Sequence, residues 1–170
     1  MKAKFLCLLA VCFAFPAVLV AQLDEKKAIV GVWEVTISPT GQLVPQTGKP
    51  VPPILSLATF GADGSFITTI GRGTVPPVPA LQGVADEIGP AYGRWFQTTA
   101  REFRLTFYHV MLKEGAVNGF VRVQSTDVLS DSGNEFAAHG QADFLDANWN
   151  VVFSVTTEVK GTRLETPGQP

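Results

Sequence analysis

The chain has 170 residues, 13 Lys and Arg against 15 Asp and Glu, and a formal net charge of −2 at neutral pH. Hydrophobic residues make up 46% of it, charged residues only 16%, and the basic residues form no cluster. This balance argues against nucleic acid as a partner. With two histidines and two cysteines, the chain also lacks the residues for a multi-histidine or thiolate metal site, so we expect no bound metal.

The N-terminal segment has the three-part pattern of a secretory signal. Two lysines precede an apolar, uncharged run over residues 5–20, and Ala21-Gln22 follows as a cleavage site. We therefore expect a signal peptide over residues 1–21 and a single mature domain over residues 22–170, secreted or periplasmic. Since about 16 apolar residues fall short of the ~20 of a membrane helix, no stable membrane insertion is expected after cleavage. Both cysteines lie in the apolar run, so no disulfide is expected.

The mature chain begins with a short stretch that reads as a helical lead-in, residues 22–30, and then changes to alternating apolar and polar positions. Such alternation predicts strands, here bounded by turn residues such as Asp63-Gly64. Strand-like runs occur at residues 32–38, 54–61, 65–71, 94–99, 102–112, 119–129, 135–144 and 150–160. Eight strands joined mostly by short turns predict an all-β fold, an eight-stranded antiparallel up-and-down barrel without exposed edges.

Two long, proline-rich connections interrupt the series of short turns. They span residues 39–53 and 72–92, and the second contains a short stretch, residues 80–88, that reads as helical. Because long ordered loops in compact domains are often functional, we expect them to form a mouth or lid at one end of the barrel.

One strand-like run carries the best candidate for chemistry. Alternation places Phe107, His109 and Met111 on its apolar face, directed into the barrel. An inward imidazole can bind a polar group of a ligand or act as a base, or it can be a core histidine hydrogen-bonded to a neighbour. Asp127 alternates with apolar positions and is expected near the inner rim. Arg72, in the second long connection, either pairs with an anionic ligand or is a solvated charge.

The sequence contains no nucleophile elbow, phosphate loop, dinucleotide fingerprint or zinc-protease motif. We therefore assign no catalytic residue and expect no cofactor.

Two short motifs mark the ends of the predicted barrel. Gly31-x-Trp33 opens the first run, and Arg163 follows the last one. With the meander between them, these motifs resemble the lipocalin-like (calycin) barrels and small exported bacterial proteins of that type. The resemblance implies that Arg163 packs across Trp33 to close one end of the barrel, and that the interior tends to bind apolar ligands.

Three functions are compatible with these observations. The first is binding of a small hydrophobic molecule without catalysis. The second is an isomerase or cyclase on a barrel of the allene-oxide-cyclase type, with His109 as the acid or base. The third is a structural or interaction protein whose barrel is filled by side chains. A binder needs a cavity, an enzyme needs turnover that depends on His109, and a filled barrel has neither.

Overall fold

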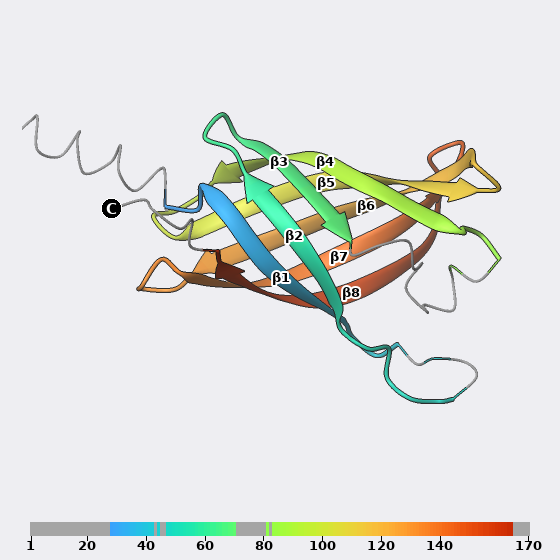
Figure 1. Cartoon of the computed structure of the whole chain (residues 1–170), viewed down its shortest axis with the longest axis horizontal. Coiled ribbons are helices and arrows are strands. Elements are labelled where there is room, and N and C mark those ends of the chain that lie inside the picture. The colour runs from blue at the N-terminus through green and yellow to red at the C-terminus, as the bar shows by residue number, and fades with distance from the viewer. Residues whose placement is uncertain (1–27, 43, 45–46, 71–80, 82, 165–170) are drawn as a thin grey trace, which may run out of the picture.

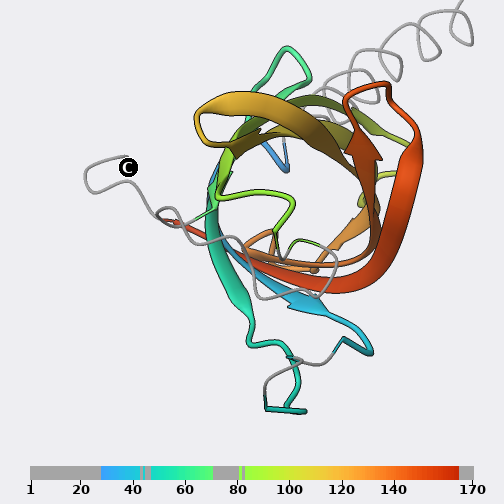
Figure 2. The same cartoon turned by 90° about the vertical axis from the view of Figure 1, so that its right-hand side faces the viewer.

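The computed structural model describes residues 28–42, 44, 47–70, 81 and 83–164, and these form a closed barrel (Figures 1 and 2). Each strand pairs antiparallel with the next one along the chain, and the last strand pairs with the first. The strands are β1 (Gly31–Pro39), β2 (Ile54–Phe60), β3 (Ser65–Ile70), β4 (Glu87–Gln97), β5 (Glu102–Lys113), β6 (Ala116–Leu129), β7 (Glu135–Asp146) and β8 (Val151–Arg163). The prediction of an all-β, eight-stranded antiparallel up-and-down barrel is confirmed.

The segment before β1 is described only from Ala28, so the predicted signal peptide and most of the predicted helical lead-in lie outside the described residues. The described part of the lead-in, residues 28–30, forms a turn rather than a helix. In the part of the chain that the structure describes, we find no helix long and apolar enough to cross a membrane.

The strands follow from the period-two pattern of the sequence. In β5 the side chains of Phe103, Leu105 and Phe107 are buried, while the intervening Arg104 is exposed. Tight turns then reverse the chain, as at Glu114-Gly115, where φ is 51° and 78°. Positive φ at both central residues matches the twist of the flanking strands, which is why a residue tolerant of that conformation is needed there.

The fourth strand differs from its prediction. A strand at residues 94–99 and a helical stretch at residues 80–88 were expected, but β4 already begins at Glu87. The strand continues through a proline because its register against β5 shifts between Ile88 and Ala91, so that Gly89 and Pro90 together face Val110. A proline has no N–H to donate to the ladder, and a β-bulge accommodates it. The predicted strand is too short because Pro90 falls in the proline-rich connection predicted over residues 72–92, whereas the bulge admits it to the strand.

The end of the barrel at which β1 begins and β8 ends is filled with aromatic side chains. Trp33 is completely buried and packs edge-to-face on Phe136 and Phe60, with ring centroids 5.1 and 6.3 Å away. The guanidinium carbon of Arg163 lies 4.3 Å from the centroid of the Trp33 ring. Its Nη1 donates to the carbonyl of Val30 at 2.7 Å, and Nε and Nη2 donate to that of Gly133. This end is therefore closed by stacked rings and a multiply hydrogen-bonded arginine.

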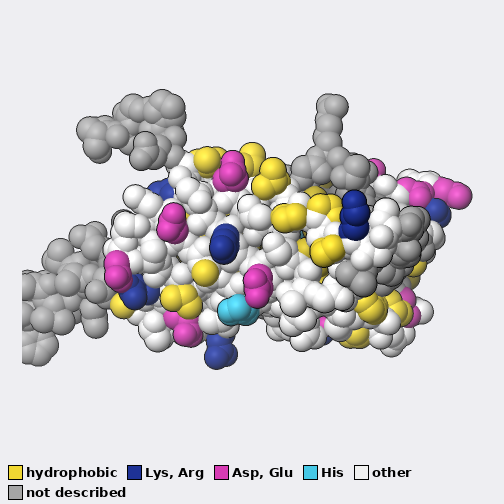
Figure 3. All heavy atoms as spheres, turned by 90° about the horizontal axis from the view of Figure 1, so that it is seen from below, with side chains coloured by type: hydrophobic (Ala, Val, Ile, Leu, Met, Phe, Trp, Pro, Cys, Tyr) yellow, Lys and Arg dark blue, Asp and Glu magenta, His cyan; other side chains and the backbone are white. Residues whose placement is uncertain are grey.

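The opposite end carries the described parts of the two long connections and the β5–β6 and β7–β8 turns (Figure 1). The outer surface of the barrel carries both charged and hydrophobic side chains. On the face shown in Figure 3, acidic and basic side chains are interspersed, and hydrophobic ones gather toward the end with the long connections.

Candidate functional site

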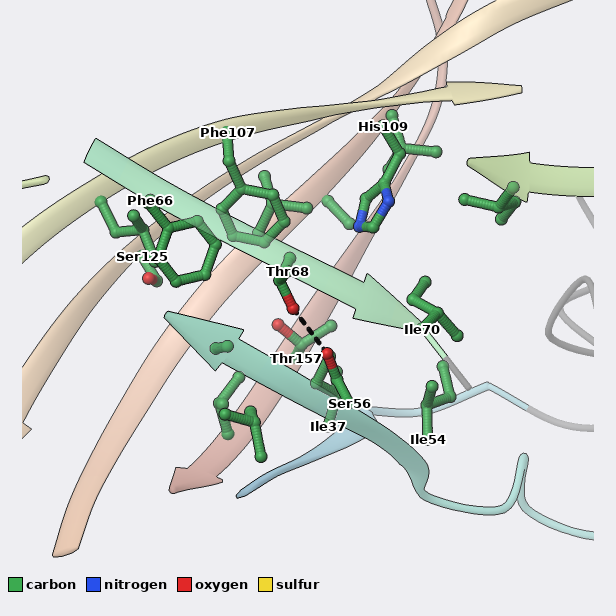
Figure 4. Close-up of a pocket in the computed structure, with 18 of the residues that line it drawn as sticks. Ile37, Ile54, Ser56, Phe66, Thr68, Ile70, Phe107, His109, Ser125 and Thr157 are labelled. Carbon is green, nitrogen blue, oxygen red and sulfur yellow. Dashed lines mark hydrogen bonds between the residues drawn. The ribbon is translucent and has the colours of Figure 1, made fainter. Parts of the chain in front are cut away.

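The barrel interior contains a cavity of about 110 Å³ next to the aromatic layer (Figure 4). Every strand contributes to its wall, because each places alternate side chains inward. Most of the lining side chains are aliphatic or aromatic. The polar ones number six: Ser56, Thr68, His109, Ser125, Asp127 and Thr157.

The size of the cavity limits what it can hold. Pockets for drug-sized ligands measure ~300–1,000 Å³, whereas an apolar cavity of ~150 Å³ is enough for benzene. At about 110 Å³ the cavity suits one molecule of roughly that smaller size.

A short cap segment, Leu81 and residues 83–86, covers the cavity at the end with the long connections. Leu81 is 1% exposed, lines the cavity and packs in one cluster with Val51 from the other long connection. Figure 2, which looks onto this end, shows the segment before β4 crossing the barrel opening. The described parts of the two long connections therefore meet over the cavity.

The cap segment is tied to the β5–β6 turn by Asp86. Its Oδ1 accepts from Nζ of Lys113 at 2.7 Å, and its Oδ2 accepts from the backbone N–H of Glu114 at 3.0 Å. These hydrogen bonds lower the pKa of Asp86, the Lys113 contact contributing most. Asn118 adds a bond from Nδ2 to the carbonyl of Val84, at 2.7 Å. The contacts are exposed, so the cap is held by bonds that water can replace.

His109 projects from β5 into the cavity, where Figure 4 shows its ring beside the aromatic wall. It is 4% exposed, and its Nδ1 lies 2.8 Å from the carbonyl oxygen of Gly89 in the β4 bulge. A carbonyl only accepts, so Nδ1 carries the proton and donates it. Burial lowers the pKa of His109, and the Gly89 bond opposes this only in part. The imidazole is therefore neutral, and its Nε2 is an acceptor.

Asp127 projects from β6 into the same cavity and is 2% exposed. The Ser125 hydroxyl donates to its Oδ1 at 2.5 Å. Burial raises the pKa of Asp127 to about 6, against the weaker, opposite effect of the Ser125 bond. Among the described residues no cation pairs with it. A buried carboxyl without a counter-charge is costly, which marks this part of the wall as unusual.

Three hydroxyl groups complete the polar part of the wall. The hydroxyl oxygens of Ser56 and Thr68 are 2.6 Å apart (Figure 4), and each also lies within 3.0 Å of a backbone carbonyl oxygen, that of Thr69 for Ser56 and that of Leu57 for Thr68. One hydroxyl donates its proton to the other, and the second donates to its carbonyl. Thr157, on the β8 side, makes no side-chain hydrogen bond to another described residue. Ser56 and Thr68 are thus satisfied by the protein, and Thr157 adds a further hydroxyl to the cavity wall.

The residues singled out from the sequence fall in different places. Phe107 and His109 line the cavity. Met111, 1% exposed, packs in the cluster beneath the cap and is not among the lining residues. Arg72 lies outside the described residues. Trp33 and Arg163 lie at the other end, away from the cavity.

Sequence reasoning missed other parts of this site. The alternation that pointed Asp127 inward was correct, but its depth of burial was not foreseen, and neither Thr157 nor Leu81 was considered. Continuing the alternation through every strand would have found Thr157. No local signal identifies Leu81, because its position depends on how a long loop folds back.

Within residues 28–42, 44, 47–70, 81 and 83–164 there is no group of three or more His, Cys, Asp or Glu that could hold a metal ion. The fold and the site define the class of this protein: a closed eight-stranded antiparallel barrel around a small, mainly apolar cavity. No known family model matches the chain, and neither a curated protein nor a solved structure is significantly similar to it.

Proposed function

We propose that this protein is an exported, lipocalin-like barrel of the calycin type that binds one small hydrophobic molecule in its interior. The observation that carries the proposal is the cavity itself: about 110 Å³ of space, walled mostly by apolar side chains from all eight strands. A barrel that served only as a scaffold would gain stability by filling this space.

The unfilled cavity lowers the free energy of unfolding by a considerable amount. Unfilled volume in a protein core costs ~24 cal/mol per Å³, so a cavity of about 110 Å³ corresponds to roughly 2–3 kcal/mol. Typical domains are stable by only 5–15 kcal/mol. A ligand that fills the cavity recovers dispersion contacts with its walls, so an apolar molecule of benzene size gains from binding.

An enzymatic role is the second candidate, and one observation favours it. The unprotonated Nε2 of His109 lies in a mainly apolar cavity, where a neutral imidazole can take a proton from a substrate. Binding has the stronger support, because the described wall contains no second group placed against His109 for a catalytic pair. Turnover of a bound molecule that stops in His109→Gln would favour the enzyme instead.

The proposal is tested by binding and by filling the cavity. Toluene titrated into the mature protein and followed by calorimetry should bind with a stoichiometry of about one. Ala142 faces the cavity and Ala137, on the same strand, faces solvent. Ala142→Leu should remove toluene binding, whereas the matched control Ala137→Leu should keep it. Native mass spectrometry of protein purified from its own host would then reveal the natural ligand. Absence of toluene binding to the unsubstituted protein, together with a bare-chain mass from the host, would refute the proposal.

A further inference from the structure

The β4 bulge determines which hydrogen-bonding group His109 presents to the cavity. Because Gly89 and Pro90 together oppose one residue of β5, the Gly89 carbonyl is available to the ring of His109, 2.8 Å from Nδ1. That carbonyl can only accept, so it holds His109 in the tautomer with its proton on Nδ1. The other ring nitrogen, Nε2, is left as a hydrogen-bond acceptor.

This acceptor has no partner among the residues that the structure describes. No hydrogen bond to Nε2 is formed, although the ring is 4% exposed and lines the cavity (Figure 4). Among the described residues, the one fully buried side-chain atom without a partner is Oε1 of Gln97. Nε2 of His109 instead faces the cavity, where a donor group of a bound molecule can reach it and supply the hydrogen bond that the nitrogen makes in water. The hydroxyl protons of Ser56 and Thr68, in the same cavity wall, are both used within the protein: one hydroxyl donates to the other, which donates to a backbone carbonyl.

We propose that the ligand carries a hydroxyl group that donates a hydrogen bond to Nε2 of His109, while its apolar body fills the rest of the cavity. The inference rests on the proposed binding function and narrows the ligand to small hydroxylated molecules such as phenols and short branched or cyclic alcohols. A carbonyl or ether oxygen is rejected at this position, since two acceptors repel each other. A cationic group is disfavoured because the mainly aliphatic and aromatic wall would have to desolvate it.

The experiment compares two probes of the same shape, phenol and toluene, which differ in the hydroxyl group. Both are titrated by calorimetry into the mature protein and into two variants at position 109. His109→Phe keeps an aromatic ring without an acceptor. His109→Gln keeps an acceptor, and its amide N–H can still donate to Gly89. Circular dichroism establishes that each variant is folded.

The quantity of interest is the ratio of the two dissociation constants, toluene over phenol. Relative to the unsubstituted protein, we expect this ratio to fall at least about tenfold in His109→Phe, because phenol then buries an unpaired hydroxyl. In His109→Gln the ratio should fall by a smaller factor, which also tests the idea should the Phe variant not fold.

The outcomes are distinct for the two proposals. If toluene and phenol both bind but their ratio is the same in all three proteins, His109 does not select a donor; the inference is then overturned while the binding function stands. If neither probe binds the unsubstituted protein, the inference is overturned, and a bare-chain mass of the protein from its host then refutes the binding function as well.

Discussion

The buried carboxyl of Asp127 makes this protein's stability depend on pH in a direction opposite to that of most carboxylates. The pKa of Asp127 rises from an ordinary value of 3.8 to about 6 on folding, because burial disfavours its charged form. At 1.36 kcal/mol per pH unit, ionised Asp127 destabilises the folded state by about 3 kcal/mol. The side chain is almost fully buried, so solvent screening reduces this figure little.

The sign follows from proton linkage. Below pH 3.8 the carboxyl is protonated in both the folded and unfolded chains, and Asp127 contributes no penalty. Between pH 3.8 and about 6 the unfolded chain releases its proton first, so the free energy of unfolding falls as the pH rises. Above about pH 6 the full penalty is present and remains constant.

Asp127→Asn removes the charge and keeps an oxygen that can accept from Ser125. We expect this variant to exceed the unsubstituted protein in free energy of unfolding by about 1–3 kcal/mol at pH 7.5, and to match it or fall slightly below at pH 4. The measurement is urea denaturation at both pH values, with the difference between the two proteins as the result. Other titrating groups cancel in that difference. A difference that is the same at pH 4 and pH 7.5 would show that the burial of Asp127 has been misjudged.

Three further predictions concern the closed end, the cap and export. Arg163→Ala removes a cation–π contact worth ~0.5–2 kcal/mol and several charge-assisted hydrogen bonds to backbone carbonyls. Urea denaturation should show that the free energy of unfolding falls by at least about 2 kcal/mol. An unchanged denaturation midpoint would contradict the role of Arg163 in closing this end of the barrel. Asp86→Ala should speed the exchange of bound toluene, measured by NMR line shape, with little change in secondary structure; identical exchange rates would mean that the cap does not gate the cavity. N-terminal sequencing of the protein from its host should start at Gln22, and a chain that retains its first residues would rule out the proposed signal peptide.

The sequence indicated the fold because the signals for it are local. A period of two in β5 places Phe107 and His109 on one face whatever the rest of the chain does, and the same rule pointed Asp127 inward. The turn at Asp63-Gly64 is equally local, since φ of Gly64 is 82°, which a glycine adopts without strain. These short-range rules are enough for eight strands, their inward faces and their antiparallel order.

Other features of the site required the tertiary structure. The proline-rich composition of residues 72–92 predicts a loop that includes Gly89 and Pro90, and only pairing with β5 shows that the strand begins before them. The tautomer of His109 depends on the β4 bulge, because the Gly89 carbonyl accepts from its Nδ1. The cavity volume is a small difference between two large volumes, the volume that the eight strands enclose and the volume of the side chains that fill it. The sequence by itself determined which faces of the strands meet in the barrel. Register, bulge and loop placement decided how much space is left between them, since these depend on contacts between residues far apart along the chain.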